Sequence, residues 1–226
     1  MFEIEIKCLL LDKDALNKTK NALALIFPAM SLFSEESQIN HYFGIDGSLK
    51  TLLSSLTSYL SAEQISELGQ IVDSQPTDYS LRTRCINEKI VKLVIKIAGN
   101  GETSANGVLR REFEVTLNIS IDELDKIIIN CGFGYLSKWS RQRQEYNLDA
   151  QTKVCFDRNA GYGWIVEIEK MADSEAQARQ ARTEVEAIVK QASLQELDPQ
   201  RLERMFAFYN QNWKDYYGTD KVFIIT

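Results

Sequence analysis

The residues best suited to chemistry are charged side chains that alternate with apolar ones along short segments. The first such segment, residues 2–8, reads FEIEIKC and places Glu3, Glu5 and Lys7 at every second position. Successive side chains of a β-strand point to opposite faces, so these three residues are expected to share one face of a strand. Six further segments show the same alternation of charge: Arg82 and Arg84; Lys92 and Lys96; Arg110, Glu112 and Glu114; Arg141 and Arg143; Lys153, Cys155 and Asp157; Glu167 and Glu169.

The number of charged positions on these strands predicts a ligand of mixed charge. One charged face is ordinary, because the outer face of an antiparallel sheet is usually solvated. Seven such faces made mostly of Glu, Asp, Arg and Lys are harder to explain by solvation. Buried charges need partners or ions: carboxylates can hold hard cations, and Arg and Lys can hold phosphate oxygens. A triphosphate bound together with its metal ions satisfies both sets.

Helices that can cover the apolar faces of these strands are indicated by their capping residues. Asp12 precedes an apolar-periodic stretch that ends at Pro28, and Ser61, Ser120 and Ser174 each begin a capping-box spacing. Asp198 before Pro199 predicts a last helix that reaches roughly Trp213. The pattern therefore predicts an α+β fold, with about eight strands forming a closed or nearly closed antiparallel β-barrel. Its charged face points inward and its helices pack outside.

Length and composition fit one globular domain. The chain has 226 residues, of which 44% are hydrophobic and 26% charged. We expect a single domain over residues 1–226, with a mostly helical insertion at about 44–78, a hairpin loop at 99–107 and C-terminal helices after about 173. The net charge of −6 leaves no global basic field to attract nucleic acid.

The four cysteines, at positions 8, 85, 131 and 155, are too far apart for a zinc site. The chain starts with a charged strand pattern rather than a signal peptide, and no run of eighteen apolar residues indicates a membrane span. We therefore expect a cytoplasmic protein that has no membrane partner and binds a small molecule containing a triphosphate.

The order of these segments resembles the CYTH superfamily, the triphosphate tunnel metalloenzymes. EIEIK at residues 3–7 matches the ExExK signature of that family. It is followed by QINHYF at 38–43, RTR at 82–84, LVIK ending at Lys96, REFEV at 111–115, RQR at 141–143, CFD at 155–157 and GYGWIVEIE at 161–169. The resemblance covers roughly residues 1–170. It implies an eight-stranded antiparallel tunnel and a requirement for Mg²⁺ or Mn²⁺.

The resemblance also implies roles for individual residues. Glu3, Glu5, Glu167 and Glu169 are the leading metal ligands, with Glu112, Glu114 and Asp157 close by. Seven basic residues are expected to bind the substrate: Lys7, Arg82, Arg84, Lys92, Lys96, Arg141 and Arg143. Of these, Lys7, Arg82, Arg84, Lys96 and Arg143 are expected to be catalytic. The family often has Lys-x-Arg where this chain has Arg141 and Arg143, which exchanges a compact ammonium for a planar guanidinium.

Three functions remain open at this stage. The leading hypothesis is a divalent-metal-dependent triphosphatase, in which a metal-activated water attacks the terminal phosphoryl group of an inorganic, nucleoside or related organic triphosphate. The second is a class IV adenylate cyclase that forms cyclic AMP and pyrophosphate, because GYGWIVEIE has some likeness to the cyclase branch. The third is a non-catalytic binder of polyphosphate or nucleotide, which the many carboxylates argue against because they repel a phosphate ligand without metals.

Three other features favour structural roles. His41, the only histidine, alternates out of phase with Gln38, Asn40 and Tyr42, which predicts that it lies outside the charged face. Gly161–Gly163 lacks the lysine and the following helix of a phosphate loop, and predicts a hairpin turn. The aromatic residues between Phe206 and Tyr217 have the spacing of a packed helix face.

Overall fold

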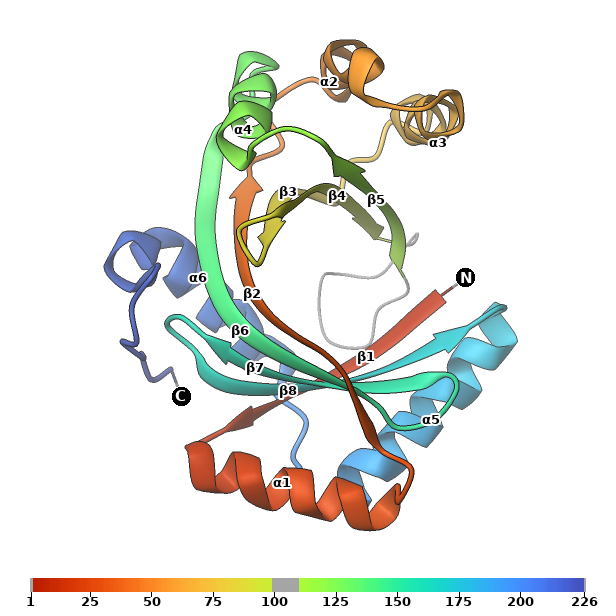
Figure 1. Cartoon of the computed structure of the whole chain (residues 1–226), viewed down its shortest axis with the longest axis vertical. Helices are drawn as coiled ribbons and strands as arrows, with labels where there is room; N and C mark the ends of the chain where they lie inside the picture. The colour runs from red at the N-terminus through yellow and green to blue at the C-terminus, as the bar shows by residue number, and fades with distance from the viewer. Residues whose placement is uncertain (1, 99–109, 226) are drawn as a thin grey trace.

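The computed structural model describes residues 2–98 and 110–225, so the hairpin loop predicted at 99–107 lies outside the described residues (Figure 1). The described part contains eight strands and six α-helices. In chain order they are β1 (Phe2–Leu10), α1 (Lys13–Ile26), β2 (Ser31–Phe43), α2 (Leu49–Leu56), α3 (Ala62–Asp73), β3 (Tyr79–Ile86), β4 (Ile90–Ala98), β5 (Arg110–Leu117), α4 (Ile121–Asn130), β6 (Tyr135–Asn147), β7 (Thr152–Asn159), β8 (Gly163–Ala172), α5 (Glu175–Gln191) and α6 (Pro199–Tyr216).

The strands form one curled antiparallel sheet in the order β1-β8-β7-β6-β2-β3-β4-β5, which confirms the predicted eight antiparallel strands. Figure 1 shows the sheet curling so that one of its faces lies on the inside. Closure into a complete barrel is not found, since no ladder joins the edge strands β1 and β5 within the described residues. Both edges carry carboxylates, which would repel each other as directly opposed pairs. Lys96 of β4 links the two edges through its side chain instead, because it lies 3.3 Å from Glu3 of β1 and 2.9 Å from Glu112 of β5.

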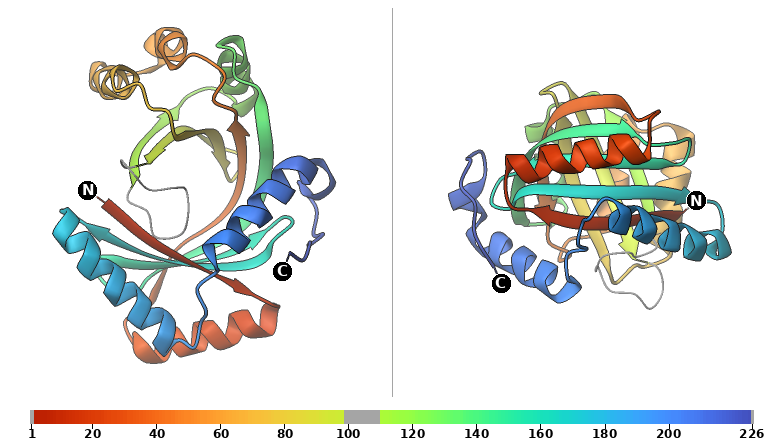
Figure 2. Two further views of the ribbon diagram at one scale, coloured as in Figure 1. Left: turned by 180° about the vertical axis from the view of Figure 1, so that it is seen from behind. Right: turned by 90° about the horizontal axis from the view of Figure 1, so that it is seen from below.

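The helices lie on the outside of the curl and cover the apolar faces of the strands (Figures 1 and 2). One hydrophobic cluster joins α1 and α5 to β1, β7 and β8, and includes Ile6, Leu23 and Val166. A second joins α2, α3 and α4 to β3, β4 and β5, and includes Leu52 and Leu93. Because the apolar faces are turned outward to these helices, the charged faces are turned inward. The inside of the curl, lined by these charged faces, is called the lumen below.

The predicted helix starts are confirmed. Asp12 accepts a hydrogen bond from the Ala15 amide at 2.8 Å and caps α1. Ser61 forms a capping box with Gln64 at the start of α3, and Ser120 and Ser174 cap α4 and α5. Asp198 caps α6, which begins at Pro199 and ends at Tyr216, three residues beyond the expected Trp213. These caps satisfy backbone amides that would otherwise be left without partners.

Residues 44–78 connect β2 to β3 and contain α2, a short 3₁₀ turn (Thr57–Tyr59) and α3, which rest on the second hydrophobic cluster. All four cysteines are buried and unpaired. Among the helices of the described residues, none combines the length and the apolar character needed to cross a membrane.

Candidate active site

Charged side chains of the lumen form two chains of ion pairs. In the first chain, Lys7 contacts Glu5 and lies 3.1 Å from Glu167, which also contacts Arg143. Arg143 donates two hydrogen bonds of 2.7 Å to Asp157, and Arg141 Nη1 donates one of 2.8 Å to the same carboxylate. The first chain therefore runs from β1 through β8 and β7 to β6.

The second chain of ion pairs lies on the opposite arm of the sheet. Glu114 lies 2.5 Å from Lys92 and 3.3 Å from Arg84. Glu112 lies 2.9 Å from Lys96 and 4.0 Å from Arg82. Lys96 also contacts Glu3 across the open edge of the sheet. The structure thus places every predicted metal-binding and substrate-binding residue on the lumen side, in one of these two chains or beside them.

Three carboxylates, Glu3, Glu5 and Glu169, meet where the two chains come together. One oxygen from each lies within 4.8 Å of the others, and no other such cluster of potential metal ligands occurs in the described part of the chain. Oxygen donors of this kind suit a hard divalent cation such as Mg²⁺ or Mn²⁺. The other predicted ligands, Glu112, Glu114, Asp157 and Glu167, lie outside this cluster, each paired with lysine or arginine.

The two carboxylates of β8 differ in electrostatic environment. Burial and the neighbouring Glu3 and Glu167 raise the pKa of Glu169, although Arg143 partly opposes the rise. Burial also acts on Glu167, but Lys7, Arg143 and Arg141 hold the pKa of this carboxyl well below its usual range. Glu167 is therefore balanced by three protein cations. Glu3 and Glu5 are also paired, with Lys96 and Lys7, but the raised pKa of Glu169 shows that repulsion remains at the cluster, which a bound cation can offset.

Positive charge is concentrated beside this acidic cluster, on β3 and β6. Burial, together with the charges of Arg82 and Arg141, lowers the pKa of Arg84 to about 9. Burial raises the pKa of Tyr42, but the adjacent charges of Arg82, Arg141 and Arg84 bring it down to about 8. Arg82 Nε is buried and makes no hydrogen bond within the described residues. Crowded cations and an unsatisfied buried donor are the properties of a site that accepts an anion.

Four lumen residues were not among the predicted site residues. Gln38, Asn40 and Tyr42 of β2 accept hydrogen bonds from Arg141, Arg84 and Arg82 at 2.8, 3.0 and 2.7 Å. Glu145 of β6 pairs with Lys153 at 2.6 Å. The alternation of QINHY and of RQRQE was available in the sequence and would have included all four. Gln38, Asn40 and Tyr42 carry no charge, so the alternation of charged residues does not select them, and Glu145 extends the Arg141–Arg143 alternation by one further position.

His41 lies on the outer face, as its alternation predicted. It is buried, with Nδ1 at 2.6 Å from Asp125 of α4 and Nε2 at 3.2 Å from the Tyr217 hydroxyl. Asp125 also accepts hydrogen bonds from Thr83 at 2.7 Å and Tyr135 at 2.6 Å. His41 therefore belongs to a buried network that joins β2, β3, α4 and β6 to the end of α6.

The aromatic residues of α6 pack against the turn between β7 and β8. Tyr209 is fully buried, and its ring lies 4.2 Å from Trp139 and 5.4 Å from Tyr162. Gly161 and Gly163 form the predicted hairpin turn, both with positive φ. A Cβ atom at Gly161 would lie 2.8 Å from the Tyr209 ring, so only glycine allows this approach. Tyr209 is thus core, and Phe206, Trp213 and Tyr216 pack partly buried against the same cluster, as the spacing predicted.

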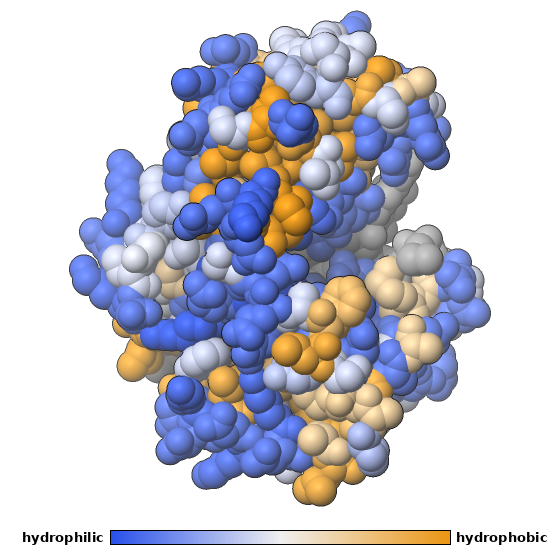
Figure 3. All heavy atoms as spheres, viewed as in Figure 1, coloured by the Kyte–Doolittle hydropathy of each residue, from blue (hydrophilic) through white to orange (hydrophobic). Residues whose placement is uncertain are grey.

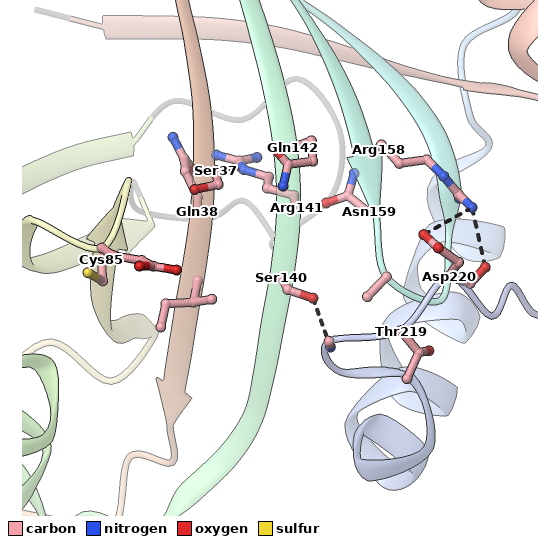
Figure 4. Close-up of a pocket in the computed structure, with 14 residues that line it drawn as sticks. Ser37, Gln38, Cys85, Ser140, Arg141, Gln142, Arg158, Asn159, Thr219 and Asp220 are labelled. Atoms are coloured by element: carbon pink, nitrogen blue, oxygen red, sulfur yellow. Dashed lines mark hydrogen bonds and ion pairs between the residues drawn. The ribbon is translucent and has the colours of Figure 1, made fainter.

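A pocket of about 400 Å³ lies beside β2, β6 and β7 and is lined by residues of both faces, among them Gln38 and Arg141 of the lumen face and Ser140 and Gln142 of the outer face (Figure 4). Ser140 and Arg158, which alternate with the lumen residues Arg141 and Asp157, contact Gly218 and Asp220 there. Figure 3 shows hydrophilic residues across the middle of the face viewed in Figure 1, with apolar residues above and below them. Glu3, Glu5 and Glu169 do not line this pocket, and its mixture of Glu88, Arg158 and Asp220 favours no particular ligand.

Comparison with solved structures shows the same fold in distant proteins. The PH1819 protein of Pyrococcus horikoshii superposes with a TM-score of 0.62 and 18% identity, over 89% of this chain and 99% of that protein. The PH1012 protein of the same organism gives 0.59 and 16%, over 87% and 94%. A protein of Vibrio parahaemolyticus, provisionally named an adenylate cyclase, gives 0.56 and 18%, over 86% and 90%. No curated protein matches the chain.

The family model of the CYTH domain matches residues 72–201, which is more than half of the chain. This match includes β3 to β8 and therefore the strands that carry Arg82, Arg84, Arg143 and Glu169. The chain belongs to the CYTH family, whose members are typically metal-dependent enzymes that act on triphosphates.

Proposed function

We propose that this protein is a divalent-metal-dependent triphosphatase that hydrolyses inorganic, nucleoside or related organic triphosphates in the lumen. The observation that carries the proposal is the carboxylate cluster of Glu3, Glu5 and Glu169 beside the crowded arginines of β3 and β6. The cluster supplies oxygen ligands for Mg²⁺ or Mn²⁺, and the arginines supply donors for phosphate oxygens. A triphosphate that carries a metal ion complements both parts.

The residues of the lumen can perform most of the work of binding and orientation. Arg82, Arg84 and Arg141 can hold the non-bridging oxygens, and Lys7, Lys96 and Arg143 lie where negative charge from both substrate and carboxylates must be balanced. Phosphoryl transfer depends mainly on positioning and on stabilising charge that spreads over the phosphate oxygens. A metal bound to Glu3, Glu5 and Glu169 would supply Lewis-acid activation and additional positive charge.

Cyclisation of ATP is the alternative, and it needs a further element. The nucleophile of a cyclase is the ribose 3′-hydroxyl of its own substrate, so the ribose must be held in line with the α-phosphate. Trp139, which alternates in phase with Arg141 and Arg143, has its ring centroid 4.6 Å from that of Tyr162 and 4.2 Å from that of Tyr209, so its ring is used for packing. The hydroxyl of Tyr42, the aromatic residue opposite Arg82, accepts a hydrogen bond from that arginine. These contacts favour hydrolysis over a site built around a base.

Product analysis distinguishes the candidates. We expect the purified protein with Mg²⁺ or Mn²⁺ to release orthophosphate from inorganic triphosphate or from a nucleoside triphosphate. Cyclic AMP and pyrophosphate from ATP, without ADP and orthophosphate, would replace the proposal with cyclisation. Tight binding of triphosphate without any turnover would identify a non-catalytic binder. Substitution of Arg82, Arg84 or Lys96 serves as the site control, because it should impair either reaction.

A further inference from the structure

The inner face of β2 presents three neutral acceptors to three arginines. Arg141 Nε donates to Gln38 Oε1 at 2.8 Å, and Arg84 Nε donates to Asn40 Oδ1 at 3.0 Å. Arg82 Nη1 donates to the Tyr42 hydroxyl at 2.7 Å. Arginine has only donors, so the amide oxygens of Gln38 and Asn40 must face it. Gln38 and Asn40 are each 4% exposed, so these contacts are built into the protein interior.

Arg143, the remaining arginine of this region, is held differently. It contacts two carboxylates, donating two hydrogen bonds to Asp157 and one to Glu167. Two carboxylates on one guanidinium cancel its charge, whereas an amide or hydroxyl fixes its orientation and leaves the charge in place. The side chain types of β2 therefore distinguish arginines that retain positive charge from one that does not.

Nearby carboxylates do not remove this difference. Glu114 is closer to Lys92 than to Arg84, at 2.5 against 3.3 Å, and Glu112 is closer to Lys96 than to Arg82, at 2.9 against 4.0 Å. The acidic partners of Arg141 are Asp157 at 2.8 Å and Glu167 at 4.0 Å, and both are shared with Arg143. Each acidic partner of the three arginines is thus also shared with a lysine or with Arg143, so none of the three is neutralised by a carboxylate of its own.

The contacts of Arg82 indicate what this positive charge is for. The hydrogen bond to Tyr42 fixes its guanidinium, yet its Nε is buried and without a partner in the described residues. A buried donor left unsatisfied is costly unless a ligand completes it. Because Arg82 lies close to Arg84 and Arg141, a ligand that bridges these guanidinium groups is an anion.

We propose that Gln38, Asn40 and Tyr42 are positioning residues that hold Arg141, Arg84 and Arg82 for the oxygens of a triphosphate while leaving their charge uncancelled. This inference rests on the proposed function, because it takes the anion to be the substrate. It assigns a specific role to three positions of β2, because the side chains that contact these arginines carry no charge; the next residue on that face, Glu36, accepts a hydrogen bond from Gln38 at 2.6 Å instead. The neutrality of Gln38, Asn40 and Tyr42 is what the site requires.

The test is Asn40→Asp, which keeps the size of the side chain and its acceptor but adds a negative charge. A purely structural role would be preserved, because a carboxylate is at least as good a partner for Arg84. We expect the thermal midpoint of the ligand-free protein to stay equal or rise. We expect the Kd for inorganic triphosphate with Mg²⁺, measured by calorimetry, to rise by about tenfold or more, and its dependence on salt to weaken.

Gln142→Glu is the matched control. It adds the same charge on β6 beside Arg141, but on the outer face, and should leave the Kd unchanged. If Asn40→Asp does not fold, Gln38→Glu makes the equivalent change at Arg141. Equal Kd values for the wild type and the variant would refute this inference alone. Failure of the wild type to bind triphosphate would refute the proposed function and this inference with it.

Discussion

Glu169→Gln should stabilise the metal-free protein but reduce the stabilisation that Mg²⁺ gives. Oxygens of Glu3, Glu5 and Glu169 lie within 4.8 Å of one another, and two unit charges at such a distance repel by about 3 kcal/mol at an effective dielectric constant of about 20. Loss of two such repulsions is offset in part by loss of the attraction to Arg143, whose Nη1 is 4.0 Å from Glu169. We estimate a net gain of about 2 kcal/mol for the variant without metal.

The assay is thermal unfolding at about pH 8.5, in a chelator and in excess Mg²⁺. For a chain of this size, the gain corresponds to a midpoint about 4–8 °C above that of the wild type in the chelator. At a Mg²⁺ concentration about 100 times its Kd, the wild type should gain about 2.7 kcal/mol. The variant should gain much less because it has lost a ligand.

The control for this experiment is Glu145→Gln, which removes another lumen carboxylate that lies outside the cluster and pairs with Lys153. This variant should lose a little stability and keep the full response to Mg²⁺. A Glu169→Gln protein that melts below the wild type in the chelator and still responds fully to Mg²⁺ would show that the three carboxylates do not form the metal site.

Three other predictions follow from separate parts of the structure. Triphosphate turnover should disappear in a chelator and return with Mg²⁺ or Mn²⁺, whereas full turnover in EDTA would exclude the metal role. Asp125→Asn should lower the free energy of unfolding by about 2–4 kcal/mol, because buried Asp125 accepts hydrogen bonds from His41, Thr83 and Tyr135. Burial alone would raise the pKa of Asp125, but these hydrogen bonds lower it in the folded protein. The stabilisation they give is therefore present above the ordinary aspartate pKa and is lost as pH falls through the folded value. Denaturant titrations should show the difference in unfolding free energy between wild type and variant becoming smaller in acid. Gly161→Ala should cost about 1–3 kcal/mol in a thermal melt through its positive φ and the nearby Tyr209 ring, and an unchanged midpoint would contradict this.

Alternation predicted which side chains enter the lumen but not which ones meet there. A period of two assigns Glu167 and Glu169 to the same face, and the sequence offers no reason to separate them. Only the structure shows that Glu167 contacts both Lys7 and Arg143, whereas the carboxylate of Glu169 lies beside those of Glu3 and Glu5. The contacts depend on neighbouring strands distant in sequence, so periodicity along one strand cannot supply them.

The way the sheet ends was also beyond the sequence. Charged faces on seven segments favoured an enclosed lumen, and the curl of the sheet provides most of it. Whether β1 and β5 share a ladder depends on twist and on the charges at both edges, which are properties of the whole sheet. The bridge from Lys96 to Glu3 shows that side chains cross this edge without backbone pairing.

The two faces of β2 connect the buried His41 network to the proposed anion site. Asn40 and Tyr42 flank His41 and point into the lumen, while His41 points outward to Asp125 and Tyr217. A shift of one residue along this strand would bring His41 into the lumen and remove both acceptors from their arginines. The outer contacts of His41 therefore fix the register on which the inner contacts depend. Asp125→Asn should then weaken triphosphate binding as well as lower the free energy of unfolding, although Asp125 lies on α4, outside the lumen.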